Sequence, residues 1–164
     1  MKKKNYILIG ALVILLVGGF ILYKANNSKL SNDTNINYIE YAYGGGYGTM
    51  ADTATKRIII KSDLTVQFSN DYNNSTKIFK ISSDKYNELC AYIIDNSSIF
   101  INKPKENMNV MDGGSSHIIV KTTDGQEYNV GGYMITDKKY TNMKTKIIDI
   151  AGKKRFNNYA NSIK

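Results

Sequence analysis

The sequence predicts an α+β protein, in which an N-terminal transmembrane helix precedes a single domain with a mainly antiparallel sheet of about six strands and two helices. Three observations support this prediction. One apolar run without charges lies near the N-terminus, short β-rich segments are joined by short links, and two stretches have the apolar spacing of an amphipathic helix. A chain of 164 residues has room for one ordinary domain and a short appendage.

The apolar run covers residues 6–23 and contains no charged side chain. As a helix it would be roughly 27 Å long, close to the ~30 Å thickness of the hydrocarbon core. Tyr6 and Tyr23 stand at its ends, where aromatic rings with a polar tip prefer the headgroup level. Residues 2–4 are lysines, and no small-residue cleavage site follows the run. We therefore expect an uncleaved signal-anchor in the cell membrane, with the N-terminus cytoplasmic and the C-terminal domain extracytoplasmic.

The rest of the chain divides into three parts. Residues 1–24 are expected to form the cytoplasmic stub and the anchor. The polar and aperiodic residues 25–34 that follow are typical of a flexible stalk. Residues 35–152 are expected to form the extracytoplasmic domain, and residues 153–164 a polar tail. The segments that predict strands are residues 36–43, 56–61, 65–69, 77–81, 117–121 and 127–130.

Two helices are predicted from caps and apolar stripes. Residues 82–84 offer N-caps for a helix of about 12 residues. Asp137 begins the second helix, and Gly152 ends it. The stripes are Tyr86, Leu89, Cys90 and Ile93 on the first helix, and Tyr140, Met143, Ile147 and Ala151 on the second. Residues 44–55 predict a long loop without regular structure, and Asp124-Gly125 predicts a hairpin with a type I′ turn.

The composition argues against several classes of function. The net charge is +8, but the basic residues outside the anchor flanks are dispersed, and residues 153–155 are their one short cluster. Nucleic-acid binders gather basic residues on one face or stripe, so we expect no nucleic-acid partner. One cysteine and one histidine exclude a disulfide framework and a zinc or haem site built from those residues. We expect neither a metal nor a cofactor.

No set of residues predicts a catalytic centre. Cys90 and His117 are the one possible thiol–imidazole pair, yet Cys90 falls on an apolar helix stripe, where a thiol acts as a small hydrophobe. The glycines of residues 44–48 lack the lysine of a phosphate loop, and residues 71–75 lack the closing glutamate of a calcium loop. Asp112, Asp124 and Asp137 are each explained by a turn or a cap.

The tyrosines beside the glycine clusters are the candidate binding residues. Glycines gather at residues 44–48, 113–114 and 131–132, at strand ends or between elements, where loops commonly carry function. Tyr43, Tyr47 and Tyr133 lie next to these clusters, and tyrosine supplies rigid contact area with a hydroxyl group. We expect a partner-binding surface at this Gly-rich end. The alternative is that the glycines serve unusual turns and the tyrosines point into the core.

The order of elements also resembles a known family. A Gly-rich loop (Gly44–Gly46 and Gly48) after the first strand, a central helix and a hairpin with Tyr128 are similar to emfourin-type domains. The resemblance covers roughly residues 36–151 and extends to uncharacterised envelope domains of Gram-positive bacteria. It implies a small α+β fold and inhibition of thermolysin-like metalloproteases. The emfourin-type proteins lack a membrane anchor.

The leading hypothesis is a non-catalytic, membrane-anchored binding or interaction module. Its partners would be the lipid bilayer, through residues 6–23, and an envelope protein or glycan. The alternatives are an envelope hydrolase that uses residues around 112–133, an inhibitor of an extracellular protease, and a subunit whose main contact is the transmembrane helix near Gly18-Gly19.

Overall fold

A computed structural model describes residues 30–162, apart from residues 103, 108 and 110–112. The chain separates into two compact units, Met1–Leu30 and Ser31–Lys164, and all the described strands and helices belong to the second. Within the described part of the chain, no helix is long and apolar enough to cross a membrane. The predicted span over residues 6–23, with Tyr6 and Tyr23, lies outside the described residues.

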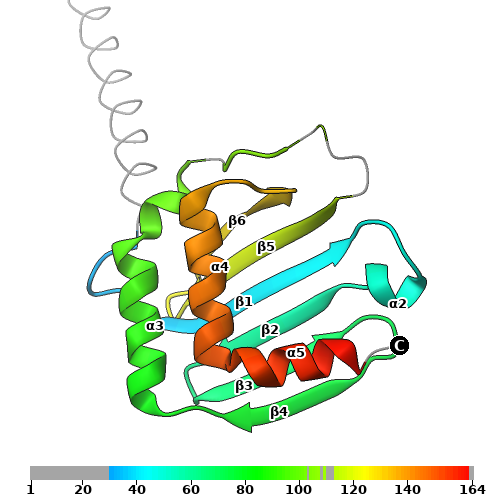
Figure 1. Cartoon of the computed structure of the whole chain (residues 1–164). Helices are drawn as coiled ribbons and strands as arrows, with labels where there is room; N and C mark the ends of the chain where they lie inside the picture. The colour runs from blue at the N-terminus through cyan, green and yellow to red at the C-terminus, as the bar shows by residue number, and fades with distance from the viewer. Residues whose placement is uncertain (1–29, 103, 108, 110–112, 163–164) are drawn as a thin grey trace, which may run out of the picture. The chain divides into compact units, whose positions relative to one another are not determined.

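The predicted α+β fold with one antiparallel sheet is confirmed. Six strands lie in the order β4-β3-β2-β1-β5-β6, and every neighbouring pair is antiparallel (Figure 1). The strands are β1 (Ile36–Gly45), β2 (Lys56–Lys61), β3 (Thr65–Asn70), β4 (Thr76–Lys80), β5 (Gly114–Thr122) and β6 (Glu127–Tyr133). All six correspond to predicted segments, although β5 starts earlier and β6 ends later than expected.

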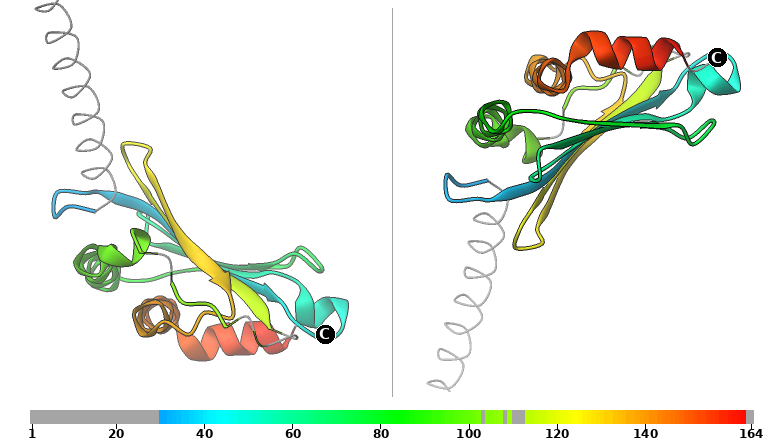
Figure 2. Two further views of the ribbon diagram at one scale, coloured as in Figure 1. Left: turned by 90° about the horizontal axis from the view of Figure 1, so that it is seen from above. Right: turned by 90° about the horizontal axis from the view of Figure 1, so that it is seen from below.

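The two faces of the sheet differ in what covers them. Figure 2 shows the helices packed on one face of the sheet. Side chains alternate between the two faces along each strand, so one set of them lies under the helices. This covered face supplies the fully buried Ile39, Ile58, Val66, Phe68, Ile118 and Val120. We call the opposite side the open face; it carries Glu40, Ile59, Gln67, His117 and Ile119. No described helix lies on the open face.

The two predicted helices are present and begin at the predicted caps. Helix α3 (Ser83–Asp95) starts after Ser82, whose side chain accepts the Lys85 N–H at 3.5 Å. Helix α4 (Lys138–Ala151) starts after Asp137, which accepts two backbone N–H groups. It ends at Gly152, whose φ of 94° lies in the left-handed region that glycine tolerates. A 3-10 helix, η1 (Ser97–Phe100), follows α3.

Two further helices were not predicted. Helix α2 (Met50–Thr53) lies in the expected loop, where Thr49 and Asp52 form a capping box. Helix α5 (Lys153–Asn161) replaces most of the expected polar tail. Only 4% of Phe156 and 7% of Tyr159 is exposed, so this segment belongs to the folded domain.

Helix α5 is held against β3 and the β3–β4 turn. The Phe156 ring packs edge-on against Phe68, with ring centroids 5.2 Å apart. The Tyr159 hydroxyl donates to the Ser75 carbonyl oxygen at 2.8 Å and accepts from Asn70 Nδ2 at 3.0 Å. Both contacts reach distant parts of the sequence, which explains why local patterns do not reveal them.

The β5–β6 hairpin is confirmed, but its turn is not of type I′. Gly125 has a φ of 86°, whereas Asp124 has no positive φ, which a type I′ turn requires. The Gly125 N–H donates to Thr122 O at 3.0 Å, and the Thr122 N–H donates to Gln126 O at 3.0 Å. These bonds close a three-residue loop that ends in a bulge at glycine.

Candidate functional site

The structure separates the two members of the possible thiol–imidazole pair. Cys90 lies on α3, which packs on the covered face, whereas His117 projects from β5 on the open face. Burial raises the pKa of the Cys90 thiol, and the hydrogen bond with Tyr86 opposes this only in part. The His117 ring instead lies over Gly131, where an added Cβ would come within 2.3 Å of Nδ1. The arrangement supplies no activated thiolate.

The candidate carboxylates that the structure describes stabilise a turn or cap a helix. Asp124 accepts the Thr122 hydroxyl, which lowers the pKa of its carboxyl group. Asp137 caps α4, and Asp112 lies outside the described residues. The 71–75 segment forms the β3–β4 turn. Among the described residues, no cluster of three histidine, cysteine, aspartate or glutamate side chains has a metal-binding arrangement.

The three candidate tyrosines do not lie on one surface. Tyr43 is on the covered face, where its ring stacks on Tyr41 at 5.7 Å and meets Phe156, and burial raises the pKa of its hydroxyl group. The register of β6 places Tyr133 on the opposite face, and its hydroxyl accepts the Gly113 N–H at 2.8 Å. Tyr47 is 89% exposed in the loop before α2. Of the three, Tyr47 is the most accessible to a partner.

The glycines at this end permit a close approach of strands and line a cavity. A Cβ on Gly114 would lie 2.8 Å from the Gly44 carbonyl oxygen, so β1 and β5 meet here only because residue 114 is glycine. A cavity of about 410 Å³ lies beside this contact. It is lined by Tyr41, Tyr43, Gly44, Gly45, Gly114, Ser115, Ser116, Met134, Ile135, Thr136 and Lys144.

Tyr47→Ala tests whether the Gly-rich end binds a partner. Because Tyr47 is 89% exposed, we expect its removal to change the free energy of unfolding by less than about 0.5 kcal/mol. Pull-down from an envelope extract with the full chain should recover less partner with the variant than with the wild type. A melting temperature several degrees lower would instead make Tyr47 a structural residue.

A larger cavity of about 780 Å³ lies between β4 and the junctions of the helices. We call it the basic groove. It is lined by Phe79, Lys80, Ile81, Ser82, Lys85, Ile150, Ala151, Gly152, Lys153, Lys154, Arg155 and Asn158. Apolar side chains from β4 and the end of α4 form part of this lining, and five of the lining residues are lysine or arginine. No aspartate or glutamate is among the lining residues.

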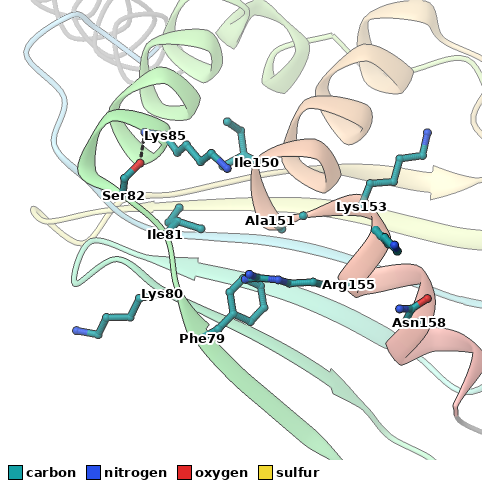
Figure 3. Close-up of a pocket in the computed structure, with 12 residues that line it drawn as sticks. Phe79, Lys80, Ile81, Ser82, Lys85, Ile150, Ala151, Lys153, Arg155 and Asn158 are labelled. Carbon is teal, nitrogen blue, oxygen red and sulfur yellow. Dashed lines mark hydrogen bonds between the residues drawn. The ribbon is translucent and has the colours of Figure 1, made fainter.

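The side chains of the basic groove come from β4, α3, α4 and α5 and from the links between them (Figure 3). Arg155 reaches from α5 across the Phe79 ring of β4, with the guanidinium carbon 4.9 Å from the ring centroid. Lys85 extends into the space between α3 and α4, whereas Lys80 and Lys153 extend outward from the rim. None of these cations forms an ion pair with a carboxylate of the described residues.

The first turn of α5 is an unfavourable place for the positive charges of the basic groove. Its N-cap is Gly152, which offers no side chain to the free N–H groups of the first turn. Residues 153–155 then place three cations at the positive end of the helix dipole, where each is unfavourable. Helix α4 also begins with two lysines, but the Asp137 carboxylate caps its first turn. At α5 no lining residue supplies a compensating anion, and a bound anion would do so.

Residues 153–155 stand out in the sequence as a basic cluster, but no local pattern connects them to a site. Lys80 and Lys85 flank the predicted cap of α3, far away in the sequence, and only the fold brings them to the same cavity. The useful local signal was a run of cations directly after a helix-ending glycine. No protein-family model matches the chain, and no similar curated protein was found.

Proposed function

We propose that this chain is a non-catalytic binding module, anchored in the cell membrane by residues 6–23, that holds an anionic envelope partner in the basic groove. The observation that carries the proposal is a cavity with five cationic lining residues and no carboxylate among them. Gly152 and residues 153–155, which form the uncapped start of α5, line the same cavity. The apolar run between Tyr6 and Tyr23 and the lysines before it support the anchor and the extracytoplasmic orientation.

The chemistry of the groove favours binding over catalysis. Its lining residues include no carboxylate, imidazole or thiol that could take a proton from a substrate or water. The Ser82 hydroxyl oxygen is occupied in capping α3. The Arg155 guanidinium group lies over the Phe79 ring. This contact holds a cation at the surface of the groove, and no lining residue beside it can act as a base.

One observation favours a second surface for protein recognition. Tyr47 and Met50 are 89% and 80% exposed, and they lie close together in the sequence at the Gly-rich end. Exposed large apolar side chains suit insertion into a partner protein. An inhibitory contact with an extracellular protease would use this end, separately from the basic groove.

The binding proposal is tested with the full chain in a neutral detergent. We expect it to bind poly-glutamate, and to bind neither poly-lysine nor neutral dextran. The affinity for poly-glutamate should fall as salt rises, because screening weakens attraction between exposed charges beyond about 10 Å at 0.1 M salt. Absence of binding to both poly-glutamate and inorganic polyphosphate at low salt would contradict the proposal.

The anchor is tested with a reporter fused after Lys164. An enzyme that is active only outside the cytoplasm should be active in this fusion, because the lysines before the run hold the N-terminus inside. The protein should also stay in the membrane fraction at full mass. A shortened, soluble product in the medium would show that residues 6–23 are a cleaved signal.

A further inference from the structure

We propose that the anionic partner is an extended acidic polypeptide segment that pairs with the free edge of β4 as a seventh strand. The inference rests on the proposed function of the basic groove, and it adds the kind of ligand and its mode of binding. Edge-strand addition takes affinity from main-chain hydrogen bonds and specificity from alternate side chains.

Two hydrogen bonds fix which backbone groups of β4 are free. At one end of the β3–β4 pair, the Asn70 N–H donates to the Ser75 carbonyl oxygen at 3.3 Å. At the other end, the Ile81 N–H donates to the Leu64 carbonyl oxygen at 3.0 Å. In an antiparallel pair, residues that exchange such bonds alternate with residues that do not.

The alternation assigns Lys77 and Phe79 to the bonds with β3, opposite Phe68 and Val66. The N–H and carbonyl groups of the other β4 residues therefore point away from β3. These residues are Thr76, Ile78 and Lys80. Because β4 is the last strand in the sheet order, no described strand pairs with this edge.

The other edge of the sheet is partly closed. The Tyr133 N–H of β6 donates to the Glu106 carboxylate at 3.3 Å, and Glu106 also forms a bridge with Ile135. Residues of η1 and Pro104 lie against Val130 around a small cavity. An added strand would have to displace these groups at β6, whereas no described strand or backbone group is bonded to the outer edge of β4.

The side chains of β4 suit an acidic strand. Ile78 is 62% exposed on the open face, an unusual position for a large apolar side chain in an edge strand. Lys77 precedes Ile78 on the covered face, and Lys80 follows it on the open face. Lysines on an edge disfavour pairing with a second copy of the same strand, and the same charges attract carboxylates.

The free edge and the basic groove are continuous. Phe79, Lys80 and Ile81 line the groove, so a strand added to β4 would run along its mouth (Figure 3). Alternate side chains of that strand would face Lys77 and Arg155 on the covered side, and the remainder would face Ile78 on the open side. A segment in which glutamate or aspartate alternates with aliphatic residues matches both sets.

The first test keeps the protein unchanged and alters the ligand. The probe is a short peptide of alternating glutamate and valine, measured by fluorescence anisotropy with the full chain. Two methylated series are made, one with N-methyl groups on the odd-numbered amides and one with them on the even-numbered amides. Each series blocks hydrogen bonding along one edge of the peptide only. We expect one of the two methylated series to bind about tenfold or more weaker, and the other to bind like the parent. Equal affinities for the two series would overturn strand addition.

The second test removes one outward N–H from β4. Ile78→Pro deletes a donor that β3 does not use, and proline is tolerated on edge strands in that orientation. Ile78→Val keeps the N–H and is the matched control. We expect Ile78→Pro alone to weaken the Glu-Val peptide about tenfold or more, while inorganic polyphosphate binds both variants equally.

The outcomes separate this inference from the proposed function. If Ile78→Pro binds the peptide as the control does while Lys153→Glu/Lys154→Glu loses it, the anion site stands and strand addition is wrong. If inorganic polyphosphate binds and the peptide does not, the ligand is not a polypeptide. If none of these anionic probes binds the wild type, the proposed function itself fails.

Discussion

Phe156→Ala is expected to lower the free energy of unfolding by about 3–5 kcal/mol, the usual range for a buried phenylalanine. Phe156 is 4% exposed, and its ring meets Phe68 at 5.2 Å and Tyr43 at 5.9 Å. Truncation would leave a cavity between α5 and the sheet and weaken the docking of the helix. Denaturant unfolding of the full chain, followed by circular dichroism, measures the change.

Asn157→Ala is the matched control for this prediction. Asn157 is the next residue on α5 and is exposed, so its truncation should change the free energy of unfolding by less than about 0.5 kcal/mol. If Phe156→Ala is as mild as the control, α5 does not pack on the sheet in solution. Residues 153–164 would then be the polar tail that the sequence suggested.

Lys153→Glu/Lys154→Glu should weaken the binding of poly-glutamate about 100-fold while leaving the domain as stable or more stable. Both side chains are exposed in the first turn of α5, so no packing is lost. Replacing a cation by an anion at a helix N-terminus is favourable by about 0.3–1 kcal/mol per site. Binding should fall because two cations at the rim of the basic groove become two anions. Denaturant unfolding and a binding titration of the same preparation measure both effects.

Lys138→Glu/Lys139→Glu provides the matched control. It makes the same change of net charge, also in the first turn of a helix and at exposed positions, but α4 begins outside the basic groove. This control should bind poly-glutamate nearly as the wild type does at moderate salt, because distant surface charges are screened. An equal loss in both variants would mean that binding depends on net charge and not on the groove.

The sheet was predictable because its signals are local. Residues 56–61 alternate between covered and open faces around an isoleucine run, and Asp124-Gly125 marks the hairpin whatever its turn type. The caps of α3 and α4 were predictable for the same reason, since Ser82 and Asp137 each bond to the backbone a few residues ahead.

Helix α5 and the basic groove depend on contacts that sequence patterns do not contain. Phe156 and Tyr159 are isolated in a polar segment, and their importance comes from Phe68 and Asn70 on β3. The Gly-rich end could also be predicted only in part. Its glycines were identified correctly as unusual, but strand register decides that Tyr43 and Tyr133 face opposite ways, and register follows from the pairing of distant strands.

The most direct test of the basic groove as an anion site is the binding isotherm of poly-glutamate with the full chain, its Lys153→Glu/Lys154→Glu variant and its Lys138→Glu/Lys139→Glu control. All three are measured at one moderate salt concentration. If the basic groove is the anion site, the wild type and the α4 control bind saturably, and the α5 variant binds with an affinity about 100-fold lower. An α5 variant that binds as tightly as the wild type would contradict this assignment.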